Sequence, residues 1–267
     1  MTISVVIPAL DEASGIADAV RSVVRSSEAD SGAGAQEVEV LVVDGGSLDE
    51  TCRLAREAGA QVFVLGGIPG GSFKESFSGS SCERHHEEAG EKADESSETN
   101  RPGRARQLRL GGERSKGEVI LFLHADTQLE AGWREAVERV LADPGCAGGA
   151  FAFRLAERGV RERWIEAWVA VRVALLGLPY GDQALFMRRS VLERMGGVPI
   201  VPMMEDLDLV RAIKRAGRME QLALRATTSS RRYRERGTLK TLLWHQVALL
   251  GWFLGWDRSR LAQRMGR

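Results

Sequence analysis

The chain has 267 residues, enough for one large α/β domain with a full core or for two small ones. Lys and Arg number 37, as do Asp and Glu, so the zero formal net charge argues against nucleic acid as a partner. The three cysteines are far apart and odd in number, which argues against a disulfide framework or a zinc cluster. Because no basic segment followed by a long apolar run opens the chain, we expect no signal peptide and a cytoplasmic location.

The amino-terminal part alternates predicted strands and helices. Residues 2–7 form an apolar run that we expect to be a buried strand stopped by Pro8, and residues 11–27 have the apolar spacing of a helix. The connecting segment PALDEA contains no GxGxxG pattern. This absence disfavours a dinucleotide-binding Rossmann protein and a methyltransferase.

A second predicted strand, residues 38–43, ends in the polar segment DGGS. An acid such as Asp44 at this point can bind a base or a ribose, and Gly45 lets a nucleotide approach the backbone. Loop formation and capping of the predicted helix over residues 48–58 explain Asp44 and Ser47 equally well. This segment alone does not decide between the two interpretations.

A third short strand is predicted over residues 61–65, and the composition then changes. Residues 66–101 are rich in Gly, Ser and Glu, so they cannot bury enough apolar surface to offset their chain entropy, and we expect a disordered surface insertion. A helix is predicted to begin within the following GRARQLRL segment. Its arginines, Arg104 among them, could clamp a phosphate or form a solvated face.

Residues 119–123 form the predicted central strand, apolar on both faces as in a parallel sheet covered by helices. His124, Asp126 and Gln128 follow it, at the carboxyl end of the strand where open α/β sheets bind ligands. A carboxylate there suits a divalent cation that also holds a diphosphate. Alternatively, Asp126 or Thr127 caps a predicted helix over residues 131–141.

The carboxyl-terminal half contains a predicted strand over residues 148–155 and an amphipathic helix over 161–176. The segment GDQ then precedes a short predicted strand over 184–187, so its polar groups lie in a loop. A helix over 205–216 opens with Glu205 and Asp206. The helix dipole stabilises carboxylates in a first turn, so these acids alone indicate only a well-capped helix.

The segments PALDEA, DGGS, LHADTQ, GDQALFMRR and EDLDLVRAIKRAG, in this order, resemble family 2 glycosyltransferases of the GT-A fold. The resemblance implies an α/β fold with a mostly parallel, doubly wound sheet flanked by helices. It covers residues 1–236, apart from the insertion, and leaves residues 237–267 as a carboxyl-terminal helical tail. FLHADT, GDQALF and TTSSRRYRERG are similar to a bacterial-type subgroup associated with selenium or arsenosugar gene clusters.

This resemblance implies inverting transfer of one sugar from a nucleotide-diphosphate sugar to a small-molecule or lipid-linked acceptor. Asp206 would be the general base, with Glu205 orienting it or the acceptor. The residues implied to bind the nucleotide are Ala9, Glu12, Asp44, Gly45 and Arg104. Those implied to line the acceptor and diphosphate sites are Gly181, Asp182, Gln183, Arg231 and Arg232. The QxxRW motif of processive synthases is absent, which favours single-sugar transfer.

The implied metal ligands are Asp126, His124 and Gln128, and the implied cofactor is Mn²⁺ or Mg²⁺. His124 stands where the DxD motif of the family has its first aspartate. A neutral imidazole favours Mn²⁺ over Mg²⁺ more than a carboxylate does. Two other classes stay open: a sugar-nucleotide pyrophosphorylase, although PALDEA is not its glycine-rich basic loop, and a catalytically silent nucleotide-binding module.

The tail concentrates Leu, Trp and Phe into residues 239–256. Its uninterrupted apolar run, residues 247–254, is much shorter than the roughly 20 residues of a membrane-spanning helix. We expect the tail to pack on the catalytic domain as a closing helix, because large exposed apolar patches are rare on monomers. The alternative is peripheral contact with a membrane, with arginines facing lipid phosphates.

Overall fold

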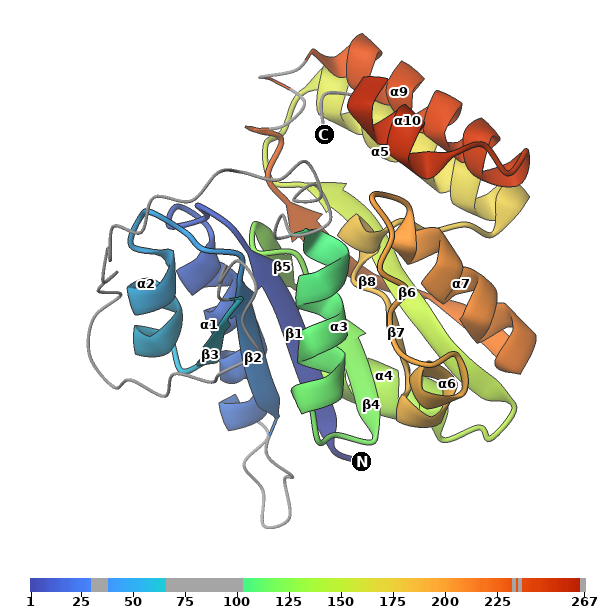
Figure 1. Ribbon diagram of the computed structural model, residues 1–267. Coiled ribbons are helices and arrows are strands. Elements are labelled where there is room, and N and C mark those ends of the chain that lie inside the picture. Colours follow the sequence, from blue (N-terminus) through green and yellow to red (C-terminus); the bar gives the residue numbers. More distant parts are fainter. Residues whose placement is uncertain (30–37, 66–102, 232–233, 235–236, 265–267) are drawn as a thin grey trace, which may run out of the picture.

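The computed structural model describes residues 1–29, 38–65, 103–231, 234 and 237–264 (Figure 1). The predicted insertion at 66–101 and Arg232 lie outside these described residues. An eight-stranded sheet has the order β3-β2-β1-β4-β7-β6-β8-β5. Its strands are β1 (Ile3–Ala9), β2 (Glu39–Asp44), β3 (Gln61–Val64), β4 (Val119–Phe122), β5 (Thr127–Leu129), β6 (Cys146–Leu155), β7 (Phe186–Arg188) and β8 (Arg218–Thr228).

The two halves of the sheet differ in strand direction. Strands β1 to β4 pair in parallel, whereas β7 runs antiparallel to β4 and β6, and β5 runs antiparallel to β8. Strand β6 pairs with β8 in parallel over most of their length. The predicted α/β class with a doubly wound sheet is therefore confirmed: the amino-terminal half is wholly parallel, and the other half is mixed.

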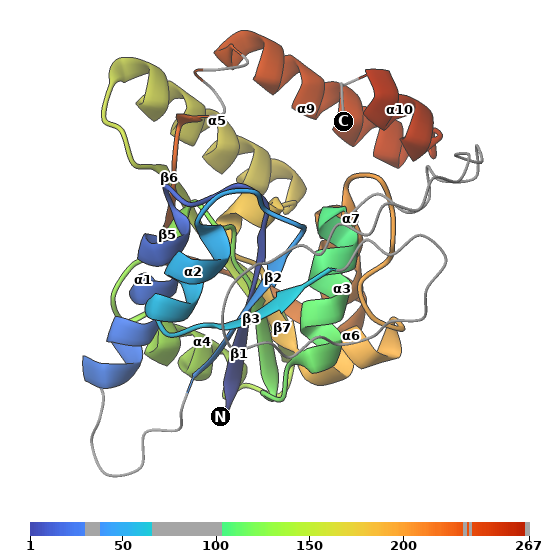
Figure 2. The same cartoon turned by 60° about the vertical axis from the view of Figure 1, so that its left-hand side comes forward.

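Helices cover both faces of the sheet (Figures 1 and 2). They are α1 (Ile16–Ala29), α2 (Thr51–Glu57), α3 (Arg104–Arg114), α4 (Trp133–Leu141), α5 (Val160–Leu176), α6 (Arg189–Arg194), α7 (Glu205–Ala216), α9 (Thr238–Phe253) and α10 (Arg258–Arg264), with the 3-10 turn η2 (Gly181–Gln183). The side chains of β4 alternate between two cores: Leu121 packs with residues of α1 and α4, and Ile120 packs with residues of α3 and α7. The predicted burial of both faces of the central strand is thus confirmed.

Strand β1 continues through Pro8, which corrects the prediction that Pro8 stops it. The Ala9 carbonyl points toward β2, where it accepts a hydrogen bond from the Gly45 N–H. Its neighbour Pro8 therefore faces β4, whose pairing with β1 ends earlier, at Val6. Because no ladder hydrogen bond is needed from the Pro8 nitrogen, proline fits inside this strand.

Several elements differ from the predicted ones. Helix α1 begins at Ile16 rather than at residue 11, because residues 11–15 form a turn with Asp11 at a φ of 52°. Strand β5 lies between the predicted central strand and the predicted helix over residues 131–141, and β5, α6 and β8 were not predicted. Helix α7, by contrast, has its predicted limits.

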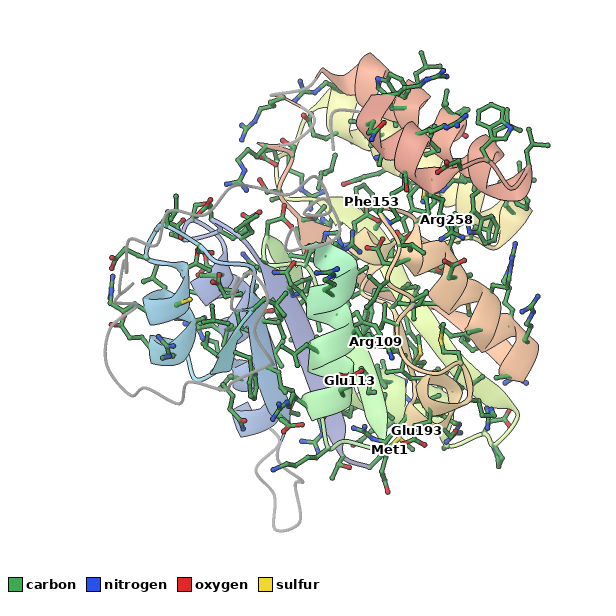
Figure 3. All side chains as sticks on the ribbon, viewed as in Figure 1. Met1, Arg109, Glu113, Phe153, Glu193 and Arg258 are labelled. Atoms are coloured by element: carbon green, nitrogen blue, oxygen red, sulfur yellow. The ribbon has the colours of Figure 1, made fainter. Side chains whose placement is uncertain are left out.

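Helices α5, α9 and α10 form a layer above the carboxyl end of the sheet (Figures 1 and 2), here called the upper layer. The tail packs inward, as expected: Leu249 and Trp252 are buried in the core that contains α7. The Asp208 carboxylate of α7 accepts a hydrogen bond from Trp252 Nε1 (3.1 Å) and pairs with Arg258 at 2.5 Å. Figure 3 labels Arg258 where α10 faces α7. In the described part of the chain, no helix has the length and apolarity needed to cross a bilayer.

Candidate active site

The site begins where β1 and β2 end side by side. The Ala9 carbonyl accepts hydrogen bonds from the Gly45 N–H (2.8 Å) and from Gln107 Nε2 (2.7 Å). The same amide of Gln107 donates to the Val43 carbonyl at 2.9 Å. Gln107 is buried on α3, so one side chain joins this helix to both strand ends. Sequence reasoning missed Gln107, although a glutamine on the apolar side of a helix signals a buried polar contact.

The loops after these two strands are joined by cross-loop hydrogen bonds. The Leu48 N–H donates to Asp11 Oδ1 at 2.7 Å, and the Glu12 N–H donates to Thr51 Oγ1 at 2.8 Å. The Ala13 N–H donates to Asp49 at 3.1 Å. Burial acts to raise the pKa of Asp49, but the bonds from Thr51 and Ala13 outweigh it and hold the pKa below its ordinary 3.8. The two loops therefore form one rigid unit.

Asp44, predicted to contact the nucleotide, is fully buried and shapes its own loop. Its carboxylate accepts hydrogen bonds from the N–H groups of Gly46 and Ser47, each at 2.9 Å, and from the Ser47 hydroxyl. This arrangement matches the loop-forming alternative. The N–H groups of Gly45 and Gly46 are both bonded within the fold, to the Ala9 carbonyl and to Asp44, and Gly46 is the exposed one of the two.

Arg231 connects the end of β8 to the first loop. Its guanidinium pairs with the Glu12 carboxylate at 2.6 Å and donates to the Ser14 hydroxyl at 3.0 Å. The structure therefore brings together two predicted site residues that are far apart in sequence, one for the nucleotide and one for the diphosphate.

An open pocket, of about 510 Å³ including the adjoining solvent, lies at the start of α3 and α7 and just beyond the end of β4. Six of its lining residues were predicted site residues: Arg104, His124, Gly181, Asp182, Glu205 and Asp206. The others are Tyr180, Met203, Met204 and His245. The pocket thus lies where four parts of the chain meet: the carboxyl end of β4, the turn η2, the first turn of α7 and helix α9.

Asp206 is held firmly at the start of α7. Its carboxylate accepts hydrogen bonds from the N–H groups of Gly181 and Leu207, each at 2.9 Å. Glu205 is 5% exposed and pairs with Arg104 at 3.1 Å. A Cβ at position 181 would lie 2.1 Å from Arg104 Nη2, so a larger residue there would displace this guanidinium.

Residues with strained backbone flank the site. In the part of the chain that the structure describes, three non-glycine residues have positive φ: Asp11 (52°), Ala184 (47°) and Met204 (63°). Asp11 lies in the first loop, Ala184 follows η2, and Met204 precedes Glu205. Strained residues of this kind cluster at functional sites because the surrounding structure must hold them.

The pocket wall contains the buried hydroxyl group of Tyr180. Tyr180 is 6% exposed, and its hydroxyl makes no hydrogen bond of normal geometry to a described residue. Burial raises the pKa of Tyr180 above its ordinary 10.0, so the hydroxyl stays protonated at neutral pH. The buried Arg172 guanidinium stacks on the Tyr180 ring at 3.4 Å. A ligand with a polar group suits such a wall.

Gln183 lies behind the pocket rather than in its wall. Its side-chain amide donates to the Phe151 carbonyl at 3.1 Å, and its side-chain oxygen accepts from the Tyr180 N–H at 3.3 Å. Gln183 therefore supports the turn that carries Gly181 and Asp182.

The three predicted metal ligands lie in different settings. Asp126 Oδ1 accepts hydrogen bonds from the hydroxyls of Thr127 (3.3 Å) and Thr228 (3.2 Å), whereas no described group is bonded to Oδ2. His124 lines the pocket, and Gln128 is exposed on β5. Among the described residues no three His, Cys, Asp or Glu side chains form a metal-binding group. One available carboxylate oxygen fits an ion held mainly by phosphate oxygens and water.

Comparison with known proteins identifies the fold. The sequence model of "Glycosyl transferase family 2" matches residues 4–66. The structure is similar to S. aureus TarS 1-349, with a TM-score of 0.57 and 16% identity, over 86% of this chain and 61% of that chain. This chain thus spans about three-fifths of the TarS fragment. TarS 1-349 has also been crystallised in complex with UDP-GlcNAc.

A second similar structure is glucosyl-3-phosphoglycerate synthase from Mycobacterium tuberculosis, in complex with Mn²⁺, UDP and phosphoglyceric acid. Its TM-score is 0.55 at 20% identity, over 90% of this chain and 75% of that one. No curated protein matches the sequence. At these identities the likeness shows the fold alone, and the fold is GT-A, as the sequence motifs implied.

Proposed function

We propose that this protein is a family 2 glycosyltransferase that transfers one sugar from a nucleotide-diphosphate sugar to an acceptor hydroxyl with inversion. One observation carries the proposal: Asp206 and Glu205 line a pocket with Arg104 of α3, and the same helix carries Gln107, which is bonded to the ends of β1 and β2. The family match over residues 4–66, which includes both loops, supports a nucleotide-sugar donor. So does the similarity to structures that contain UDP-GlcNAc or UDP.

The loops after β1 and β2 would hold the nucleotide. Ala9, Glu12 and Gly45 would contact it, and buried Asp44 would act by shaping the second loop. Arg231 and Arg232 would face the diphosphate. Arg231 already lies at the nucleotide loop through its pair with Glu12, so a diphosphate would compete with that carboxylate for the guanidinium.

Asp126 would hold a divalent cation, Mn²⁺ or Mg²⁺, with His124 and Gln128 as further candidate ligands. When bound, that ion supplies positive charge to the diphosphate leaving group. Arg104 would add a second positive charge near the pocket. Preorganised charge of this kind stabilises a developing anion more than water does.

Asp206 would accept the proton of the attacking acceptor hydroxyl as the bond to the anomeric carbon forms. Its two backbone hydrogen bonds fix the carboxylate, and one lone pair on each oxygen remains for the acceptor. Glu205 would orient the acceptor through Arg104. Asp182 and Tyr180 would complete the wall that binds an acceptor, either a small molecule or a lipid-linked one. The bacterial-type subgroup and a cytoplasmic location remain predictions.

The test is release of free nucleoside diphosphate. The purified chain is incubated with UDP and GDP sugars, Mn²⁺ and a panel of candidate acceptors, and the product is analysed for a new glycosidic bond. Transfer with inverted anomeric configuration supports the proposal. Formation of a sugar nucleotide from sugar phosphate and nucleoside triphosphate would instead indicate a pyrophosphorylase. Donor binding without turnover across the panel would favour the silent binding module.

A further inference from the structure

The outward face of α5 is apolar along most of the helix. From Trp164 to Leu176 every exposed residue is Ala, Val, Leu or Trp. The exposed fractions are 61% for Trp164, 42% for Trp168 and 78% for Leu175. The two tryptophan rings stack on each other at the surface, with centroids 6.2 Å apart. A continuous apolar face of this kind marks an interaction site.

The fold does not use this face for its own core. Helix α5 packs on the molecule through its opposite side, where Ile165 and Val169 join Leu155 of β6 and Leu242 of α9 in a small buried cluster. Two apolar stripes therefore run along one helix, one inward and one outward. Only the inward stripe is needed for folding.

Helix α9 extends the apolar surface beside α5. Both views of the ribbon show the two helices side by side in the upper layer (Figures 1 and 2). Around the end of α9, four large apolar residues are exposed by about half: Leu250, Phe253, Leu254 and Trp256. The inward packing of the tail thus leaves a second set of apolar side chains at the surface.

The upper layer also differs from the rest of the chain in charge. Helices α5, α9 and α10 together contain 7 Lys and Arg against 2 Asp and Glu, whereas the whole chain contains 37 of each. The three helices also hold four of the six tryptophans. Basic residues combined with tryptophan and aliphatic side chains suit the interface of an anionic membrane.

We propose that the upper layer docks on an anionic phospholipid surface, with the outward face of α5 as its main apolar contact. Docking between two copies of this chain would bring two basic layers together, which like-charge repulsion opposes. A lipid surface instead offers phosphates to the arginines and an apolar boundary to the tryptophans. Since no described helix can span a bilayer, the contact is peripheral.

The position of this surface has a consequence for the proposed transferase. His245 on α9 lines the pocket, so the same helix contributes to the pocket wall and to the docking layer. If the chain transfers sugars, this arrangement favours a lipid-linked acceptor, a step that rests on the proposed function. Membrane docking does not depend on catalysis, so experiments can refute the docking proposal and the proposed transferase activity separately.

The test is co-sedimentation of the full chain with phosphatidylcholine vesicles that contain or lack phosphatidylserine. We expect binding to the anionic vesicles at low salt, weaker binding at high salt, and a blue shift of tryptophan fluorescence. Trp164→Gln combined with Trp168→Gln should weaken binding by roughly tenfold or more, because the main apolar anchor is lost. Arg163→Glu with Arg260→Glu should reduce binding to anionic vesicles and abolish its salt dependence.

The matched control replaces exposed apolar residues away from the upper layer, Ile200→Gln with Val64→Gln, and should bind vesicles as the wild type does. Circular dichroism establishes that each variant is folded, and light scattering gives its mass. The proposal is overturned if the wild type does not bind anionic vesicles at low salt. It is equally overturned if the wild type is a dimer that the tryptophan variant converts to a monomer without any vesicle binding.

Discussion

The two halves of the candidate site differ in how their polar groups are satisfied. In the nucleotide half, the loops after β1 and β2 bond to each other through Asp11, Glu12 and Asp49, and Gln107 holds both strand ends. In the acceptor half, the buried Tyr180 hydroxyl makes no normal hydrogen bond to a described residue. The fold itself therefore holds the first half together, and the proposed function assigns the second half to the acceptor.

The family match follows the same division, because it covers residues 4–66 and stops before the pocket. A nucleotide is a shared ligand, so its loops can keep a common sequence pattern. Experiments on each half should accordingly separate donor binding from transfer.

The largest effect is expected from Asp206→Asn. The amide keeps the shape of the carboxylate but cannot take the proton, so transfer should fall by about 10² to 10⁴ while the affinity for nucleotide stays unchanged. Product release and calorimetric titration with UDP or GDP measure the two quantities. Glu113→Gln, a similar change on the exposed side of α3, serves as control. If Asp206→Asn reduced nucleotide affinity as much as turnover, donor binding and transfer would not be separate functions of the two halves.

Asp126→Ala should remove the metal dependence of nucleotide binding. Losing even a supporting partner of a metal site typically costs 10- to 100-fold in affinity, so the loss of a direct ligand should cost at least about that much. The experiment titrates nucleotide with Mn²⁺ and with chelator. Identical nucleotide-binding curves for wild type and variant would show that Asp126 is not a metal ligand. His124→Asp, which restores the common motif, should shift preference toward Mg²⁺ if His124 is a ligand.

Gln107→Met tests whether the nucleotide half depends on one buried amide. The change keeps the volume but deprives the Val43 carbonyl of its side-chain donor, which should cost about 1 to 3 kcal/mol of unfolding free energy. Nucleotide affinity should fall as well, because the spacing of the two loops is no longer held. Gln263→Met, on the exposed side of α10, should change neither. Urea denaturation and nucleotide titration provide the readings.

Gly181→Ala should affect the acceptor half with little effect on folding. The new methyl group would collide with the Arg104 guanidinium, which is the end of a flexible side chain and can move aside. We expect turnover to drop by about tenfold through misplacement of Arg104 and Glu205, with an unchanged melting temperature. Gly145→Ala adds the same methyl group in a turn outside the pocket, where the nearest atom is Asp143 Oδ1 at 3.3 Å, and is the comparison variant. A collapse in stability would show that Gly181 serves the fold instead.

The smallest effect concerns pH. The pKa of Asp49 is held below 3.8, so its carboxylate stabilises the folded chain at neutral pH, and that contribution is lost as the pH falls through the folded-state value. Asp49→Asn should therefore be slightly less stable than the wild type at pH 7, and the difference should shrink below pH 3.8. Thermal melting at both pH values checks this. If the difference in stability between wild type and Asp49→Asn grew on acidification, the hydrogen bonds assigned to the Asp49 carboxylate would be excluded.

The sequence allowed correct prediction of local patterns with strong periodicity. The central strand, buried on both faces, and helix α7 with its opening acids were found because their apolar spacing repeats within the segment. Strand β8 was missed because its residues pair with β6, whose partner residues lie about 70 positions earlier in the chain, and such pairing leaves little local signal. The site residues Gln107 and Tyr180 were missed for a related reason. Their roles depend on distant carbonyls and on burial that only the folded chain creates.

The three strained residues that flank the site limit how far this protein can be stabilised by engineering. Glycine at Asp11 would remove the carboxylate that accepts the Leu48 N–H. Replacing Ala184 or Met204 with glycine would relieve an unfavourable backbone conformation, which costs of order 1 to 3 kcal/mol. Each replacement would also let the neighbouring loop sample other shapes, and Met204 immediately precedes the acids of α7. We therefore expect variants selected for heat resistance alone to drift toward glycine at these positions and to lose turnover as they do.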